Sequence, residues 1–216
     1  MMIEGLMITW LGHASFKIVS KDGHVIYIDP FQLENIQQAD LVIVTHGHYD
    51  HLSIPDMKRI VTSKTTVVCP SDCISKINGN LEPKDIVPFA PMAENNVLGM
   101  KIKAVPAYNT NKVFHPKDND WLGYVVTLSG KTVYHAGDTD LIPEMEHLGT
   151  VDIALLPVSG TYVMSAKEAA SACKKIKPKI AIPMHYGSIV GNEDNAVEFE
   201  KLVNPQGIQV IILKKE

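Results

Sequence analysis

The stretch THGHYDH, residues 45–51, places three imidazoles and one carboxylate in six consecutive positions directly after an apolar run. Because alternate residues of an extended strand share a face, His46 and His48 can point to the same side. Asp50 and His51 continue into the following turn. Imidazole and carboxylate donors without a thiolate favour Zn²⁺, with Mn²⁺ and Fe²⁺ as alternatives. A surface turn with a chance cluster of histidines is the competing interpretation, and the position after a buried strand favours a metal site.

Two further ligand-type side chains follow predicted strands in the same way. Asp138 follows the run Lys131–Tyr134, and His185 follows the run Ile180–Pro183. A carboxylate can bridge two cations, so Asp138 is the natural shared ligand of a two-metal site. The alternative is a turn aspartate that caps a helix beginning near Ile142.

Length and composition favour one domain that acts on a small molecule. The 216 residues are 45% hydrophobic and 20% charged, with a net charge of −4, which suits a single domain over residues 1–216. The mild acidity argues against nucleic acid as a partner. The three cysteines are few, no leader precedes the first strand, and no apolar run approaches the ~20 residues of a membrane span. We therefore expect a cytoplasmic protein without a membrane segment, and a homo-oligomer stays open.

Short apolar runs and amphipathic stretches alternate along the chain. Several runs are continuously apolar, which is typical of strands covered on both faces, so helices are expected to flank the sheets. The predicted strands include Val25–Ile28, Leu41–Val44, Thr66–Val68, Met100–Val105, Tyr124–Leu128, Ile153–Val158 and Ile208–Leu213. The predicted helices are Ile54–Val61, Asp72–Ile77, Ile142–Leu148, Ala166–Ile176, which has a capping-box spacing at Ser165 and Glu168, and Glu193–Val203. Residues 106–120 form the longest stretch without periodicity, and a loop of this length is usually functional.

Three motifs in this order resemble the metallo-β-lactamase superfamily: H-x-H-x-D-H at 46–51, Gly137-Asp138, and His185. The segments WLGHAS at 10–15 and DPF at 29–31 are similar to its small bacterial and archaeal branch, which holds ascorbate-phosphate lactonase-like and other metal-dependent hydrolases. The resemblance implies an α/β (α+β) fold, a four-layer αββα sandwich of two similar halves.

The resemblance also implies two divalent ions, Zn²⁺ first and Mn²⁺ or Fe²⁺ as alternatives. It assigns His46 and His48 to the first ion, Asp50, His51 and His185 to the second, and Asp138 to both.

One position departs from the family pattern. The third histidine of the first ion usually lies near residues 107–109, where this chain has Tyr108 and Asn109. His115, in the long loop, is a candidate replacement. Alternatively, Asn109 binds weakly through oxygen, or the site works with one metal.

Four other residues have expected roles near the site. His13 either orients substrate or a ligand or is a structural histidine. Asp29 resembles an aspartate that braces the 46–51 loop. His135 either supports the ligands or is exposed, and Tyr186 either donates to the substrate or packs at the rim.

Together these residues favour a hydrolase in which a metal-activated water attacks a small ester, lactone or phosphodiester. Asp50 and Asp138 are the expected catalytic carboxylates. A di-iron redox protein of the same fold is the first alternative, disfavoured because such relatives carry an acidic residue where His48 stands and no flavin domain follows. The others are a nucleic-acid phosphodiesterase and a non-catalytic metal-binding protein that has lost the third histidine.

Overall fold

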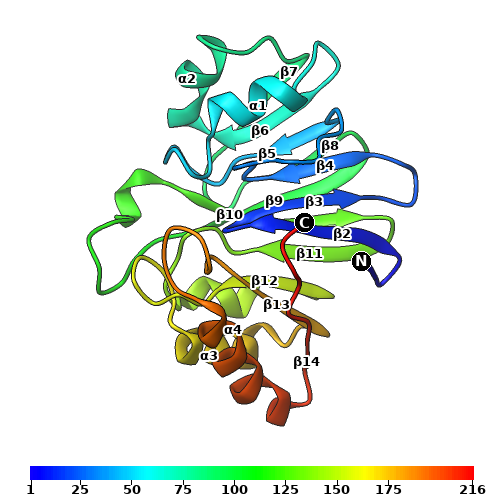
Figure 1. Cartoon of the computed structure of the whole chain (residues 1–216). Coiled ribbons are helices and arrows are strands. Elements are labelled where there is room, and N and C mark those ends of the chain that lie inside the picture. Colours follow the sequence, from blue (N-terminus) through cyan, green and yellow to red (C-terminus); the bar gives the residue numbers. More distant parts are fainter. The chain divides into compact units, whose positions relative to one another are not determined.

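The computed structural model describes all residues 1–216, and its contacts divide the chain into two compact units. Unit 1 comprises Met1–Ala90 with Lys214–Glu216, and unit 2 comprises Pro91–Leu213. Each unit contains one seven-stranded mixed sheet (Figure 1).

The sheet of unit 1 keeps its strands in sequence order. Strands β1 to β4 pair antiparallel, and β4 to β7 pair parallel. The strands are β1 (Met2–Ile3), β2 (Leu6–Gly12), β3 (Ser15–Val19), β4 (Val25–Ile28), β5 (Leu41–Ile43), β6 (Thr66–Pro70) and β7 (Asp85–Phe89). Parallel neighbours need crossover connections, which here contain α1 (Ile54–Ile60) and the pair η1 (Ser71–Cys73) and α2 (Ile74–Asn78).

Apolar packing holds these helices on the sheet of unit 1. Val42 and Val67 of the parallel strands share one buried cluster with Met57 and Ile60 of α1 and Ile77 of α2. Because both faces of these central strands are covered, their sequences are continuously apolar rather than alternating.

The sheet of unit 2 also keeps its strands in sequence order and repeats the plan, with β8 to β11 antiparallel and β11 to β14 parallel. Its strands are β8 (Glu94–Val97), β9 (Met100–Pro106), β10 (Leu122–Leu128), β11 (Lys131–His135), β12 (Ile153–Pro157), β13 (Ile180–Met184) and β14 (Gln209–Val210). Helix α3 (Ala166–Ile176) packs on β12 and on α4 (Glu193–Val203), which also packs on β13 and β14. The helical turns are η2 (Lys117–Asn119), η3 (Pro143–His147) and η4 (Asn204–Gln206).

Most predicted elements are confirmed, and three differ in a physically informative way. The stretch expected to form a strand over 208–213 is a strand only at β14, where Gln209 and Val210 pair with Ile180 and Ala181 of β13. The helix expected at 142–148 is the 3₁₀ turn η3, and the one at 72–77 is split between η1 and α2. None of the helices is long and apolar enough to cross a membrane.

Candidate metal centre

The turn after β5 brings two imidazole nitrogens to a common point in unit 1. Nε2 of His46 lies 3.0 Å from Nδ1 of His48. Two nitrogens bound to one tetrahedral zinc, at about 2.0–2.1 Å each, would be about 3.3 Å apart. The pair therefore fits a shared ion with only a small adjustment of the rings.

Asp29, directly after β4, stabilises this turn through hydrogen bonds. Its buried carboxylate accepts hydrogen bonds from the Thr45 amide at 2.8 Å, the Thr45 hydroxyl at 2.6 Å and Nδ1 of His51 at 2.7 Å. Since the Thr45 hydroxyl gives its hydrogen to Asp29, it accepts from Nδ1 of His46 at 3.0 Å. Asp29 also has a φ of 47°, a strained backbone that functional sites often retain.

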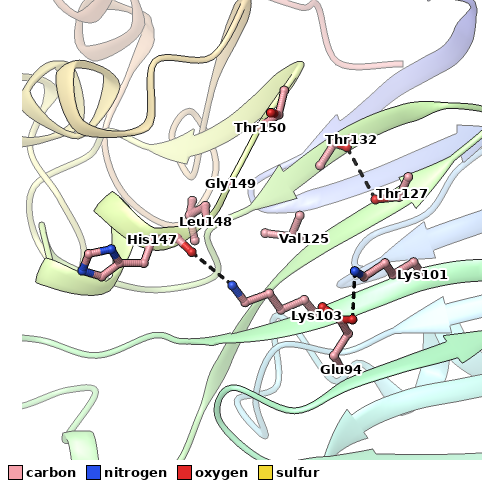
Figure 2. Close-up of a pocket in the computed structure, with 10 residues that line it drawn as sticks. All are labelled: Glu94, Lys101, Lys103, Val125, Thr127, Thr132, His147, Leu148, Gly149 and Thr150. Carbon is pink, nitrogen blue, oxygen red and sulfur yellow. Dashed lines mark hydrogen bonds and ion pairs between the residues drawn. The ribbon is translucent and has the colours of Figure 1, made fainter.

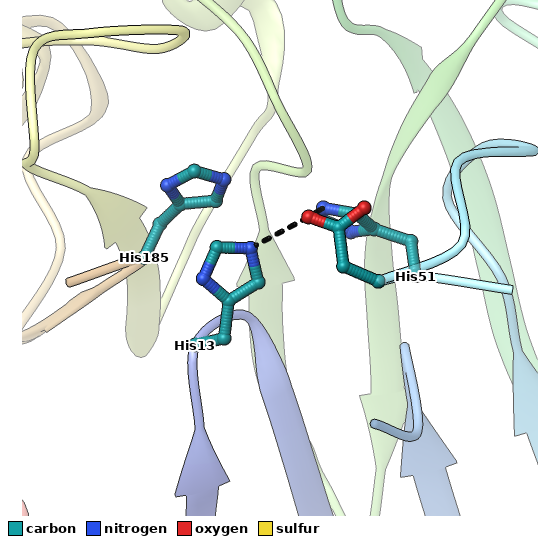
Figure 3. Close-up of side chains that lie close together, drawn as sticks. His13, His51 and His185 are labelled. Atoms are coloured by element: carbon teal, nitrogen blue, oxygen red, sulfur yellow. Dashed lines mark hydrogen bonds and ion pairs between the residues drawn. The ribbon is translucent and has the colours of Figure 1, made fainter. Parts of the chain in front are cut away.

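His13, in the turn between β2 and β3, contacts the same group of residues. Its Nε2 lies 3.0 Å from a carboxylate oxygen of Asp50, which in turn lies 3.8 Å from Nε2 of His51. The rings of His13 and His51 meet edge to face with centroids 5.6 Å apart (Figure 3). The structure thus places His13, with only 1% of its surface exposed, against Asp50.

In unit 2, Asp138 and His185 follow β11 and β13 and approach each other. One Asp138 oxygen lies 3.0 Å from Nε2 of His185 and 3.3 Å from Nε2 of His115, and all three side chains are buried. The interpretation of Asp138 as a helix cap is wrong, because η3 begins at Pro143 and has no side-chain cap.

Four of the candidate histidines share a contact on Nδ1 that bears on whether they can bind a metal. Each has an oxygen of the protein on Nδ1: Thr45 for His46, Asp29 for His51, Asn109 for His115 at 3.2 Å and Ser159 for His185 at 3.2 Å. For His46, His51 and His115 the oxygen must accept, so it fixes the ring and its tautomer and directs the Nε2 lone pair outward, as in metal-bound histidines. The Ser159 hydroxyl orients the ring of His185 and can accept or donate. The donor set and its hydrogen bonds therefore fit divalent metal.

The turn that carries Asp138 has its own supports. His135 is fully buried, and its Nδ1 accepts from the Gly137 amide at 3.2 Å, so the interpretation of His135 as an exposed residue is wrong. A Cβ on Gly123 of β10 would lie 2.6 Å from the carbonyl oxygen of Ala136, so only glycine permits this close approach.

Tyr186 and the loop lysines also have defined surroundings. Burial raises the pKa of Tyr186 to about 12, so its hydroxyl keeps its proton at neutral pH. Lys112 is paired with Asp140. Lys117 lies 3.1 Å from Glu144 and 4.5 Å above the ring of Tyr108. Both lysines are thus engaged within the protein.

Sequence reasoning missed the residues that support the histidines. Thr45 could have been found, because a hydroxyl directly before His46 at a strand end is placed to reach its ring. Ser159 and Gly123 lie far from their partners in the sequence and gave no signal.

A hollow of about 300 Å³ lies elsewhere in unit 2 (Figure 2). Its lysines are already engaged, Lys101 with Glu94 at 2.9 Å and Lys103 with the carbonyl oxygen of His147 at 3.1 Å. None of the candidate ligands lines it.

Comparison with known proteins defines the class. Residues 7–185 match the model of the β-lactamase superfamily domain. The chain therefore belongs to the β-lactamase superfamily, which confirms the resemblance and the α/β fold class inferred from the sequence.

Among its relatives, a UPF0173 metal-dependent hydrolase of Methanopyrus kandleri is 36% identical over 97% of both chains. The crystal structure of a proposed metal-dependent hydrolase from Parabacteroides distasonis matches with a TM-score of 0.85 at 32% identity. The match covers 97% of this chain and 94% of that one. Igni18, a metallo hydrolase from Ignicoccus hospitalis, has a TM-score of 0.80 at 25% identity and covers 97% and 95%.

Proposed function

We propose that this protein is a metal-dependent hydrolase that uses a metal-activated water on a small ester, lactone or phosphodiester. The observation that carries the proposal is the oxygen acceptor on Nδ1 of His46, His51 and His115, which prepares each Nε2 to bind metal. The names of the relatives support the same reaction class.

We assign the ligands as the family resemblance implies, with one addition. His46 and His48, with His115 added, would hold the first ion, Asp50, His51 and His185 would hold the second, and Asp138 would be the shared ligand. Zinc is the first candidate because the donors are imidazole and carboxylate, and manganese follows.

The residues around the ligands define the proton chemistry. When bound, divalent ions lower the pKa of a coordinated water and polarise a substrate oxygen. Asp50 would accept the proton that such a water gives up, and Nε2 of His13, 3.0 Å from its carboxylate, orients that carboxylate. Tyr186 is protonated at neutral pH, so its hydroxyl has a proton to donate to the substrate.

The partner and compartment follow from composition. A net charge of −4 disfavours an extended nucleic-acid surface, so we infer a small-molecule substrate. All three cysteines are free, which fits a reducing compartment such as the cytoplasm.

The test combines metal analysis with turnover. We expect protein purified without chelator to contain zinc or manganese by elemental analysis and to hydrolyse a member of a panel of esters, lactones and phosphodiesters. Asp138→Ala and His48→Ala should lose metal and at least about 100-fold in kcat/KM while remaining folded by circular dichroism.

His147→Ala is the matched control, because this histidine is exposed and lines the hollow that contains none of the candidate ligands. Unchanged turnover in both ligand variants would contradict a metal-dependent hydrolase. Iron as the bound metal, with oxygen-dependent chemistry and no hydrolysis, would favour the di-iron alternative.

A further inference from the structure

One side chain, Asn109, clamps His115 across the long loop. Its Oδ1 accepts from the backbone amide of His115 at 3.0 Å and from Nδ1 of the same residue at 3.2 Å. The backbone amide of Asn109 donates to the His115 carbonyl at 2.8 Å. The side-chain Nδ2 of Asn109 donates to the Tyr162 carbonyl, also at 2.8 Å. Asn109 and His115 are 9% and 2% exposed, so water competes little for these bonds.

The clamp determines where the imidazole of His115 points. The two bonds to one oxygen fix the backbone and the ring of the same residue, which leaves Nε2 3.3 Å from the Asp138 carboxylate. The neighbouring loop residues Val113 and Phe114 are 83% and 45% exposed, and Phe114 packs edge to face on the ring of Tyr162 with centroids 4.7 Å apart.

The same bonds argue against Asn109 as a ligand. A carbonyl oxygen has two lone pairs, and two donors from His115 occupy both on Oδ1. Its Nδ2 has no lone pair to offer. Asn109 therefore does not replace the family's missing histidine directly.

We propose that Asn109 is a positioning residue that holds His115, six residues further along, as the substitute for that histidine. This inference rests on the proposed function, because His115 matters there only as a metal ligand. The amide is required because it accepts from His115 and donates to Tyr162, whereas an aspartate carboxylate only accepts.

The first experiment reads the tautomer of His115 in metal-free protein by ¹⁵N nuclear magnetic resonance, with His115→Ala to assign the signal. We expect Nδ1 of His115 to carry a hydrogen in the wild type, because it donates to Oδ1 of Asn109, and to lose it in Asn109→Ala. Asn111→Ala is the control, because this asparagine is exposed in the same loop and does not contact His115. If Nδ1 of His115 keeps its hydrogen in Asn109→Ala, the inference is overturned, whether or not the wild-type protein binds metal.

The second experiment measures zinc affinity by chelator competition. We expect Asn109→Ala to lose about 10–100-fold, His115→Ala to lose at least as much, and Asn111→Ala to stay within about twofold of wild type. Asn109→Asp, which keeps the acceptor and the size, should recover part of the loss and serves if the alanine variant unfolds. If both Asn109 variants bind zinc as tightly as the wild type, the inference is overturned and the proposed function stands. If the wild-type protein binds no zinc, manganese or iron, the proposed function itself is overturned.

Discussion

At the scale of single residues, Asp29 combines three hydrogen bonds, complete burial and a strained backbone. Its two oxygens accept from Thr45 and His51, and through the Thr45 hydroxyl they also set the ring of His46. One carboxylate thus fixes two of the candidate ligands. This arrangement explains why an aspartate, which accepts at both oxygens, stands here rather than an asparagine.

We expect Asp29→Asn to weaken zinc binding by about 10–100-fold and to lower the free energy of unfolding by about 1–3 kcal/mol. The reason is that the NH₂ group of the new side chain would face an N–H or O–H donor of Thr45 or His51. Two donors cannot form a hydrogen bond with each other. Chelator competition and urea unfolding measure the two effects. Asp22→Asn, at an exposed turn, is the control, and equal affinities in the two variants would contradict this role of Asp29.

At the scale of elements, the sequence predicted helix α3 to the residue. The reason is local: Ser165 caps the helix by accepting from the Glu168 amide, and Glu168 reaches back to the Ser165 amide at 2.8 Å. Alanines and Cys173 supply its buried face. Such signals are short in sequence range, so they can be found without the fold.

We expect Ser165→Ala to lower the free energy of unfolding by about 1 kcal/mol, because the amide of Glu168 loses its partner. Ser171→Ala is the matched control on the same helix, since its hydroxyl only bonds back to the Lys167 carbonyl. Urea unfolding compares the two variants. An equal change in both would show that the cap contributes nothing specific.

Elements and contacts set by distant residues could not be predicted in this way. The edge strands β7 and β8 have little apolar periodicity, and β8 reads Glu-Asn-Asn-Val, so only pairing with β9 defines it. The motif at residues 45–51 identified a ligand cluster, but the clamp of His115 by Asn109 and the contact of His185 with Ser159 depend on loop conformation. Sequence therefore predicts ligand types better than their supports.

At the scale of the whole molecule, both units share one plan of antiparallel strands followed by parallel ones. Each also buries cysteine thiols: Cys69 and Cys73 in unit 1, and Cys173 in unit 2. Burial raises the pKa of Cys69 and Cys173 to about 12, and it raises that of Cys73 too. At pH 8 these thiols thus carry far less thiolate than an exposed cysteine, whose pKa is about 8.5.

We expect less than one thiol per chain to react with a thiol reagent at pH 8 in the native protein, and all three to react in denaturant. Because the cysteines lie in both units, peptide mapping of labelled sites at increasing urea follows the opening of each unit separately. Rapid labelling of Cys69 or Cys173 in native buffer would contradict the burial of these thiols.

The hydrogen bonds on Nδ1 have a consequence for how the protein acquires its ion. The rings of His46, His51, His115 and His185 are held by the protein itself, so capture of an ion requires little further ordering of these side chains. The ion-free form should then be a long-lived, folded species that loads quickly and exchanges one ion for another without unfolding. Which ion it carries in a cell would follow from local supply as much as from intrinsic affinity.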